Sequence, residues 1–469
     1  TLRVKVYDAT DQSFQPRGKQ VKVPGLIWYT PVTGIWQTVW MEPVAKSHIE
    51  NYYVVSDLEA GTMTVNVDVA ALHVDDLVKV EVMEGGEGYS AENPSSKLMT
   101  SAECVNGKAV LKIPEVKSWS PDSPYLYGVK VTLLRGSKVI DSVDGYTAMR
   151  NLSVIKDKTP NKYRRIALNG EIFFQFGPLD QGWWPDGLYT APTDEAMKYD
   201  LIKTKEWGYN MVRKHIKVEP ARWYYYCDVL GLAVWQDMPN LADNLKATIA
   251  TRPEEIGRMQ RNVWAMDSFY AKGTDCQVPS LWKQNWYNEW SEIINDLKCF
   301  QSIVVWVPFN EAWGQFDTEE AAVFTKALDP TRLVDAASGG NLRFCGDIID
   351  VHHYPCPAMN AFDRKFVNVL GEYGGIGYPV EGHLWQKDAN WGYGQVMTSG
   401  DEVLDLYEEF AEMLKTFIVN GCSAAVYTQT TDVEIEVNGL MTYDRKVIKI
   451  DEKRIAEINR SVIAASPKE

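Results

Sequence analysis

The chain has 469 residues, of which 45% are hydrophobic and 24% charged, and a formal net charge of −15. This acidic balance argues against a nucleic-acid partner, because nucleic-acid binding needs a surplus of Lys and Arg at the contact surface. No apolar stretch approaches the ~20 residues of a membrane helix, so we expect no membrane partner, and the length suggests about three domains.

The first predicted region covers residues 1–46. Apolar side chains alternate there as they do in strands, for example at Leu2, Val4 and Val6. Too few strands are present to close a sandwich, and isolated strands would leave unpaired edges. We therefore expect this region to be the C-terminal part of a larger β domain whose front precedes Thr1.

The second predicted region covers residues 47–155. Met63, Val65 and Val67 alternate with polar residues, and Gly-containing turn signals separate this run from similar runs. Half-buried antiparallel strands at this spacing indicate an immunoglobulin-like β-sandwich.

The third predicted region, residues 156–469, alternates short apolar strands with helical patterns. Eight strands interleaved with helices indicate a (β/α)₈ TIM barrel, and no Gly-x-Gly-x-x-Gly fingerprint follows a strand to indicate a nucleotide cofactor. The predicted strands lie near 171–177, 210–215, 232–237, 302–309, 332–336, 347–354, 366–372 and 422–428.

Two glutamates close apolar runs of this third region. Glu311 ends Ile303-Val-Val-Trp-Val-Pro-Phe-Asn-Glu, and Glu372 ends Phe366-Val-Asn-Val-Leu-Gly-Glu. Barrels place their chemistry at the carboxyl ends of strands, and two carboxylates facing one cleft are the minimum for hydrolysis of a glycosidic bond. By contrast, Asn288-Glu289 lies in an amphipathic helical pattern and is interpreted as part of a solvated face.

Arg213 and His215 share one face of the second predicted strand, because strand side chains alternate. An arginine at a barrel mouth needs a carboxylate partner, which is either a catalytic glutamate or another acid such as Asp237. We expect Arg213 to support Glu372 and to have little part in folding.

Four further residues are candidates for binding. His352 and His353 are adjacent in a predicted strand and point to opposite faces, which argues against a shared metal ion. Asp180 and Asp237 stand at strand exits, where sugar-hydroxyl binding and local capping are both open.

At this point the chain resembles glycoside hydrolase family 2, the β-galactosidase, β-glucuronidase and β-mannosidase group. Gly34-Ile-Trp-Gln-Thr-Val-Trp-Met-Glu-Pro43 is similar to the end of the family's jelly-roll domain, and Trp119-Ser-Pro-Asp-Ser-Pro-Tyr-Leu-Tyr127 to its sandwich domain. Trp306-Val-Pro-Phe-Asn-Glu311 resembles the acid/base motif and Gly371-Glu-Tyr-Gly374 the nucleophile motif.

The resemblance implies roles for individual residues. Glu311 would protonate the leaving oxygen, Glu372 would attack the anomeric carbon, Asn310 would bind the sugar 2-hydroxyl and Arg213 would orient Glu372. No metal or cofactor is expected. The residues expected to bind substrate are Asn310, Arg213, His215, Asp180, Trp184, Trp313, His352, Tyr354 and Tyr427.

Sugar identity rests on weaker features. The chain reads Phe176-Gly-Pro-Leu-Asp-Gln-Gly-Trp-Trp184 where many relatives carry an Asn-Arg-His-type motif, and Tyr427 stands where the family commonly has Trp. We predict a retaining exo-β-glycosidase, a β-galactosidase by the commonest family activity. β-Mannoside, β-glucuronide and α-L-arabinoside remain alternatives, as does a non-catalytic carbohydrate-binding protein.

The sequence also gives expectations for the binding partner and the cellular compartment. The expected partner is a carbohydrate, and a homo-oligomer stays open. The seven cysteines form no Cys-x-x-Cys pair and are interpreted as free thiols, which do not fix the compartment. A periplasmic or extracellular location is favoured over a cytoplasmic one.

Overall fold

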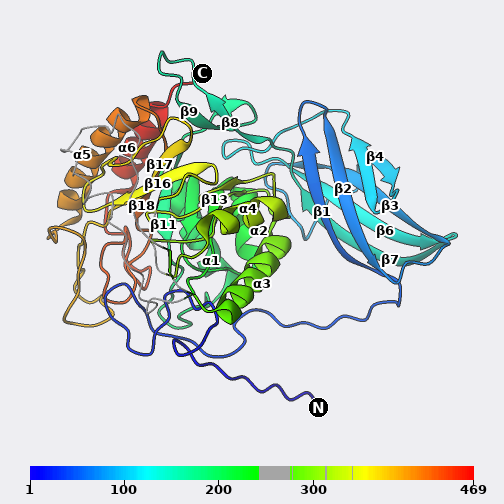
Figure 1. The fold of residues 1–469 in the computed structure, drawn as a ribbon, viewed down its shortest axis with the longest axis horizontal. Coiled ribbons are helices and arrows are strands. Elements are labelled where there is room, and N and C mark those ends of the chain that lie inside the picture. The colour runs from blue at the N-terminus through cyan, green and yellow to red at the C-terminus, as the bar shows by residue number, and fades with distance from the viewer. Residues whose placement is uncertain (242–274, 277, 312–313, 341, 469) are drawn as a thin grey trace.

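The computed structural model describes residues 1–241, 275–276, 278–311, 314–340 and 342–468. Figure 1 shows an N-terminal segment, a β-sandwich on one side and a barrel surrounded by helices on the other. The sandwich and the barrel confirm the predicted fold classes, whereas the boundaries near residues 46 and 155 stay a prediction.

Residues 1–46 form no regular strand or helix in the structure, so the strands expected from their alternation are wrong. Only isolated bridges occur, such as Gln20 with Tyr29. The physical reason is that the backbone of this segment forms hydrogen bonds with barrel loops instead of with neighbouring strands. For example, the N–H of Arg17 donates to the carbonyl of Asn240 over 2.9 Å. The segment, blue in Figure 1, runs beneath the barrel. Its identity as the end of a jelly roll stays a prediction.

The sandwich lies within a fully described stretch and consists of two antiparallel sheets. Met63 and Val65 of one sheet and Val80 and Val82 of the other are fully buried between them, as the period of two predicts. One sheet has the order β1 (His48–Asp57), β2 (Thr62–Ala70), β5 (Lys108–Lys112), and the other has the order β4 (Leu98–Glu103), β3 (Asp76–Gly86), β6 (Leu126–Arg135), β7 (Lys138–Thr147).

The barrel strands form one parallel sheet that winds almost into a closed ring, in the order β15-β14-β13-β12-β11-β18-β17-β16. Buried on both faces, these strands need no alternation and appear in the sequence as continuous apolar runs. Their bounds are β11 (Gln175–Asp180), β12 (Met211–Lys214), β13 (Ala233–Asp237), β14 (Ile303–Val307), β15 (Leu333–Val334), β16 (Ile348–His353), β17 (Val367–Gly374) and β18 (Cys422–Thr428).

Helices cover the outside of the ring (Figure 1). Tyr407, Phe410 and Leu414 of the long α5 helix are buried against the barrel, as their spacing of three and four predicts. The helices are α1 (Asp194–Glu206), α2 (Ala221–Leu230), α3 (Ser280–Leu297), α4 (Thr318–Leu328), α5 (Gly400–Val419) and α6 (Glu452–Ala464). None of the helices in the described part of the chain is long and apolar enough to cross a membrane.

A small antiparallel sheet lies at the end of the barrel remote from the N-terminal segment (Figure 1). It consists of β8 (Leu152–Lys156), β9 (Arg164–Leu168) and β10 (Glu171–Ile172). Ile166 of β9 is buried with the inward-facing barrel residues, so this sheet closes the amino-terminal ends of the strands. The strand expected over 171–177 is in fact divided between β10 and the start of β11.

The sandwich and the barrel are joined by a buried arginine. Arg150 donates through Nε to the carbonyl of Gln301 over 2.6 Å and through Nη2 to that of Ile303 over 2.8 Å. Trp119 adds a bond from its indole Nε1 to the carbonyl of Asp228 over 2.8 Å. These contacts tie the end of the sandwich to the α2 and β14 side of the barrel.

Candidate active site

The two glutamates face each other at the carboxyl ends of β14 and β17. One carboxylate oxygen of Glu311, one of Glu372 and a ring nitrogen of His352 all lie within 4.8 Å of one another. Glu311 has a φ of 52°, a left-handed conformation that is rare outside glycine and clusters at functional sites. The hydrogen bond from its N–H to the carbonyl of Ser338, 2.8 Å long, holds this turn.

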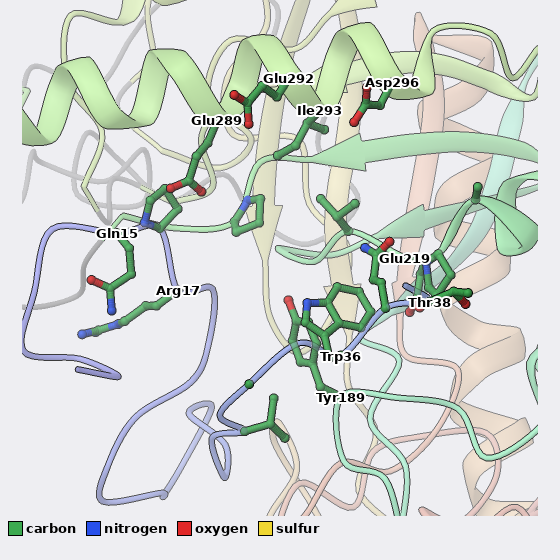
Figure 2. Close-up of a pocket in the computed structure, with 18 of the residues that line it drawn as sticks. Gln15, Arg17, Trp36, Thr38, Tyr189, Glu219, Glu289, Glu292, Ile293 and Asp296 are labelled. Atoms are coloured by element: carbon green, nitrogen blue, oxygen red, sulfur yellow. The ribbon is translucent and has the colours of Figure 1, made fainter. Parts of the chain in front are cut away.

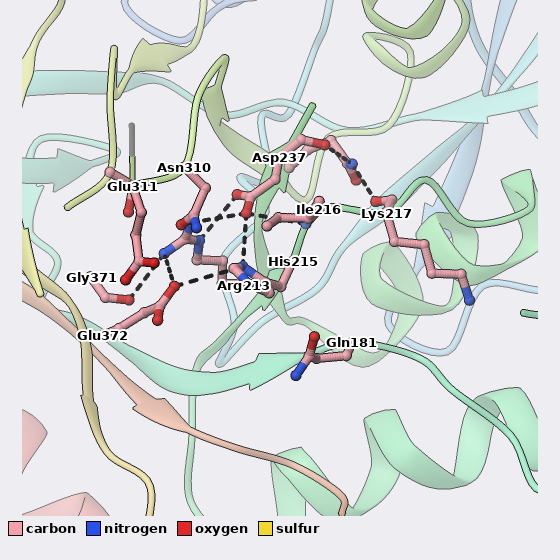
Figure 3. Close-up of polar contacts among 12 residues, drawn as sticks. Gln181, Arg213, His215, Ile216, Lys217, Asp237, Asn310, Glu311, Gly371 and Glu372 are labelled. Atoms are coloured by element: carbon pink, nitrogen blue, oxygen red, sulfur yellow. Dashed lines mark hydrogen bonds and ion pairs between the residues drawn. The ribbon is translucent and has the colours of Figure 1, made fainter. Parts of the chain in front are cut away.

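Donors surround the carboxylate of Glu372. The hydroxyl of Tyr354 donates to Oε2 over 2.8 Å, and Nη1 of Arg213 donates to Oε1 over 3.4 Å. His215 lies 3.7 Å from the same Oε1. Figure 3 shows Arg213 and His215 approaching Glu372 from one side, as their shared strand face predicts.

Arg213 binds both acids that the sequence left open. Its guanidinium contacts Asp237 at 3.1 and 2.9 Å, while Nη2 donates to Asn310 Oδ1 over 2.8 Å and Nη1 reaches Glu372. Burial works against its charge, but Asp237 and Glu372 outweigh burial and raise the pKa of Arg213. Asp237 is therefore a partner of Arg213, and Arg213 is fully buried.

His352 connects the two glutamates. Its Nδ1 lies 3.0 Å from Glu311 Oε1 and 3.5 Å from Glu372 Oε2, and its Nε2 lies 2.8 Å from Ser338 Oγ. Burial opposes a charge on the ring, but the Glu372 carboxylate and the bond with Glu311 raise the pKa of His352 above its ordinary value. His353 contacts the carbonyl of Cys356 instead, so the adjacent histidines do point apart.

His215 has the opposite electrostatic setting. Burial, followed by the nearby Lys19 charge, lowers the pKa of His215 well below its ordinary value. Its Nδ1 lies 3.1 Å from Asp237 Oδ2, which fixes the ring beside Glu372. Glu311, His352 and Glu372 are also close enough together to hold a metal ion, so the expectation of a metal-free site stays a prediction.

Asp180, Trp184 and Tyr427 are not brought to the two glutamates. Asp180 is buried and accepts from Lys214 Nζ over 2.8 Å, and Trp184 stacks under the guanidinium of Arg445 at 3.9 Å. Both lie outside the set of residues that line the cavity between the glutamates.

The expected position of Tyr427 is corrected by the structure. Its ring packs against Tyr407 of α5, on the outer face of β18, and Thr428 lines the cavity in its place. Consecutive strand residues point to opposite faces. A shift of one position therefore moves a side chain from the barrel mouth to the packed outer face of the strand. Trp313 lies outside the described residues.

Several residues that line the cavity were missed. Lys19 and Ile27 come from the N-terminal segment, Gln181 and Tyr393 from loops, and Glu436 from the long loop after β18. The cavity measures about 10 Å³, about the space of one water. The only signal for Glu436 is the acidic run Asp432-Val-Glu-Ile-Glu436, and none in the sequence places Lys19 there.

A larger cavity of about 1250 Å³ lies elsewhere, between the N-terminal segment and α3. Figure 2 shows Glu289, Glu292 and Asp296 along one side of it and Trp36 and Tyr189 on another. Neither catalytic candidate lines this space. The small cavity at the barrel mouth is therefore the candidate active site.

Comparisons with known proteins agree with this architecture. The sequence model described as "Glycosyl hydrolases family 2" matches residues 47–150, and the one described as "Glycosyl hydrolases family 2, TIM barrel domain" matches residues 190–374. Together the two models match more than half of the chain.

Individual relatives are more distant. The chain is 24% identical over 309 residues to a β-galactosidase of Streptococcus thermophilus, covering 64% of this chain and 27% of that protein. It thus spans under a third of the length of the first curated relatives it matches.

Solved structures show the same fold at low identity. A β-D-glucuronidase of Dictyoglomus thermophilum superposes with a TM-score of 0.64 at 16% identity, covering 90% of this chain and 70% of that one. A β-galacturonidase of Eisenbergiella tayi, bound to galacturonate, superposes with a TM-score of 0.62 at 17% identity, covering 89% of this chain and 73% of that one.

Proposed function

Because the chain belongs to glycoside hydrolase family 2, we propose that it hydrolyses β-glycosidic bonds with retention of configuration, with Glu372 as nucleophile and Glu311 as acid/base. The observation that carries the proposal is the short separation of the two carboxylates, whose nearest ligand atoms lie within 4.8 Å. Retaining enzymes hold the two carboxyl groups about 5–5.5 Å apart, since no water has to fit between nucleophile and sugar.

The surroundings of Glu372 suit a nucleophile. Tyr354 and Arg213 donate to different oxygens of its carboxylate, so the side chain is held in one orientation. In the first step Glu372 bonds to the anomeric carbon as the leaving oxygen departs. In the second step water breaks that bond and restores the carboxylate.

The surroundings of Glu311 suit proton transfer. His352 is hydrogen-bonded to Glu311 and fixes the carboxyl beside the scissile bond, where Glu311 gives a proton to the leaving oxygen and later takes one from water. Asn310 uses Oδ1 for Arg213, while its buried Nδ2 has no partner among the described residues. That N–H group is available to donate to a sugar hydroxyl, which supports its proposed contact with the 2-hydroxyl.

A panel of substrates identifies the sugar. A β-galactoside was predicted from family frequency, and the names of the relatives include galactosidase, glucuronidase and galacturonidase. Hydrolysis of a panel of nitrophenyl β-galactoside, β-glucuronide, β-mannoside and α-L-arabinoside separates these sugars. A carbohydrate-binding protein without activity would hydrolyse none of them.

The roles of the glutamates are tested by substitution. Glu372→Gln should abolish turnover of every aryl glycoside, because no nucleophile remains. Glu311→Ala should keep much of the first step for substrates with good leaving groups, and azide should then restore turnover and give a glycosyl azide. The matched control is Glu289→Gln. It changes the glutamate of the second Asn-Glu pair, which lies on α3, and should keep full activity.

Two results would contradict the proposal. Azide rescue of Glu372→Gln with retained configuration would exchange the two roles. Loss of activity in a chelator, with recovery on adding a divalent metal, would show that Glu311, His352 and Glu372 hold an ion.

A further inference from the structure

Five buried side chains beside the candidate active site form a closed ring of hydrogen bonds. Tyr29 donates to Glu436 Oε2 and accepts from Gln181 Nε2 over 2.6 Å. Gln181 Nε2 also donates to Gln429 Oε1 over 2.8 Å. Gln429 Nε2 donates to Asn438 Oδ1 over 2.6 Å, and Asn438 Nδ2 closes the ring on Glu436 Oε1 over 3.1 Å. The ring joins the N-terminal segment to the loops after β11 and β18.

The carboxylate of Glu436 sets the direction of the hydrogen bonds in this ring. Burial raises the pKa of Glu436, but the Lys19 charge and the donors Tyr29 and Asn438 favour its ionised form. A side-chain amide can be turned so that its oxygen and nitrogen exchange places, whereas an ionised carboxylate only accepts hydrogen bonds. Asn438 therefore has to turn Nδ2 toward Glu436 and Oδ1 toward Gln429.

The same constraint passes along the ring to Gln181. Because Asn438 presents an oxygen, Gln429 has to present Nε2 to it and turns Oε1 toward Gln181. Gln181 then has to offer Nε2 to Gln429, and the second hydrogen on that nitrogen goes to Tyr29. Both N–H groups of Gln181 are used within the ring, so the only polar atom that its amide can present outside the ring is the oxygen.

This oxygen needs a donor that the protein does not supply. Of the three amide oxygens in the ring, only Gln181 Oε1 has no donor among the described residues. Gln181 is 2% exposed and lines the cavity between Glu311 and Glu372. Figure 3 shows its amide oxygen on the side of His215. A buried acceptor without a donor is costly, so the donor has to come from a molecule that fills the cavity.

A sugar hydroxyl is such a donor. It can donate to Gln181 Oε1 and at the same time accept from another group, whereas a fluorine or an ether oxygen has no hydrogen to give. A site that hydrogen-bonds a substrate hydroxyl discriminates strongly against an analogue without it, because the polar group of the site is then left unpaired.

We propose that the ring makes Gln181 an obligate acceptor and thereby a specificity-determining residue, which requires a free hydroxyl at one position of the sugar other than C2. The inference rests on the proposed function. It adds to the contact proposed for Asn310, whose unpartnered Nδ2 is a donor on the same cavity.

The kinetic test replaces one sugar hydroxyl at a time by fluorine. The parent is the nitrophenyl glycoside of the panel that is hydrolysed fastest, and the analogues carry fluorine at each hydroxyl-bearing carbon except C2. Gln181→Met removes the acceptor. At one position, the wild type should favour the parent over the analogue in kcat/KM roughly ten- to a hundredfold more strongly than Gln181→Met does. Comparing the two ratios cancels the effect of fluorine on the reaction itself.

Two variants of the loop after β18 test the direction of the ring. Glu436→Gln replaces the carboxylate by an amide of the same shape that can also donate, so the ring amides can turn and the preference for the hydroxyl should fall. Glu434→Gln is the matched control. It removes the same charge two positions away, where Glu434 accepts from the N–H of Thr30 over 2.7 Å, and should keep the preference.

Two kinetic results overturn the proposal. The first is equal discrimination by the wild type and by Gln181→Met at every position of the sugar. The second is a full preference for the hydroxyl in Glu436→Gln, because the carboxylate would then not set the direction of the ring.

A binding measurement separates failure of this inference from failure of the proposed reaction. If the wild type hydrolyses no glycoside, calorimetric titration with galactose, mannose, arabinose and their deoxyfluoro analogues needs no turnover. Weaker binding of one fluorinated analogue by the wild type, but not by Gln181→Met, supports the role of Gln181. Equal losses in both proteins, or no binding of any of these sugars, overturn it.

Discussion

At the scale of single residues, the site depends on buried charges that share partners. Arg213 neutralises Asp237 and also reaches Glu372 and Asn310, so one guanidinium both balances the interior and orients two functional side chains. A group with this many partners cannot serve catalysis alone, because its removal leaves acids buried without a counter-charge.

Arg213→Ala should lower both activity and stability. The loss of orientation at Glu372 should appear in kcat, and the uncompensated Asp237 should reduce the free energy of unfolding by about 3–5 kcal/mol. This replaces the expectation that Arg213 has little part in folding. Urea unfolding and steady-state kinetics measure the two effects. Arg222→Ala, which removes an exposed pair with Asp194, should change the free energy of unfolding by less than about 1 kcal/mol.

The lowered pKa of His215 predicts that the stability of the protein depends on pH. Its pKa in the folded protein lies well below the ordinary 6.5, so on acidification the unfolded chain takes up a proton that the folded protein refuses. Its contribution to stability is therefore present above about pH 6.5 and is lost as pH falls below it, by up to about 1.4 kcal/mol per pH unit.

The measurement is urea unfolding of the wild type and of His215→Gln between about pH 5 and pH 7. The variant should lose this acid-side slope. His352 contributes with the opposite sign, because its raised pKa stabilises the protein below pH 6.5 and the effect fades as pH rises. An unchanged slope in His215→Gln would contradict the prediction, because the ring would then take up its proton at the same pH in the folded and the unfolded protein.

At the scale of elements, the barrel strands and both glutamates were predictable because the signal is local. Continuous apolar runs identify strands buried on both faces, and a carboxylate at the end of such a run must reach the mouth. Lys19 and Glu436 were missed because loops that are distant in sequence bring them there, and no local pattern encodes that approach. The predicted position of Tyr427 at the barrel mouth differs from the structure because an apolar run does not reveal which of two neighbouring residues faces inward.

Tyr427 and Tyr354 provide a matched pair of substitutions. The hydroxyl of Tyr427 is buried without a partner among the described residues, so Tyr427→Phe should leave activity unchanged and stability equal or slightly higher. Tyr354→Phe removes a donor to Glu372 and should lower kcat about tenfold or more. A large loss of kcat in Tyr427→Phe alone would restore its predicted place in the sugar pocket.

At the scale of the whole molecule, the sandwich and the barrel are mechanically joined. Arg150 donates to two barrel carbonyls beside β14, and Trp119 to one on α2, all of them buried. Polar groups buried in this way are expensive to separate, so the two parts should lose their structure together.

Arg150→Ala should uncouple the two parts. It removes the donor to the carbonyl of Gln301, at a cost of about 1–3 kcal/mol for a group left unsatisfied, whereas the carbonyl of Ile303 keeps a donor in Arg332 Nε over 3.2 Å. Calorimetry of the wild type should show one unfolding transition, and the variant should show two or one that is markedly broader. Two separate transitions in the wild type would mean that the junction does not couple them.

The N-terminal segment over the barrel mouth also has an evolutionary consequence. The groups that would break the bond stand on barrel strands, whereas Lys19 and Ile27 stand on a segment without regular structure, which tolerates substitution more readily than a packed strand. Under the proposed function, changes in residues 17–29 would alter the sugar preference and leave the proposed reaction unchanged. An engineer who seeks a new specificity should randomise this segment and leave the barrel intact.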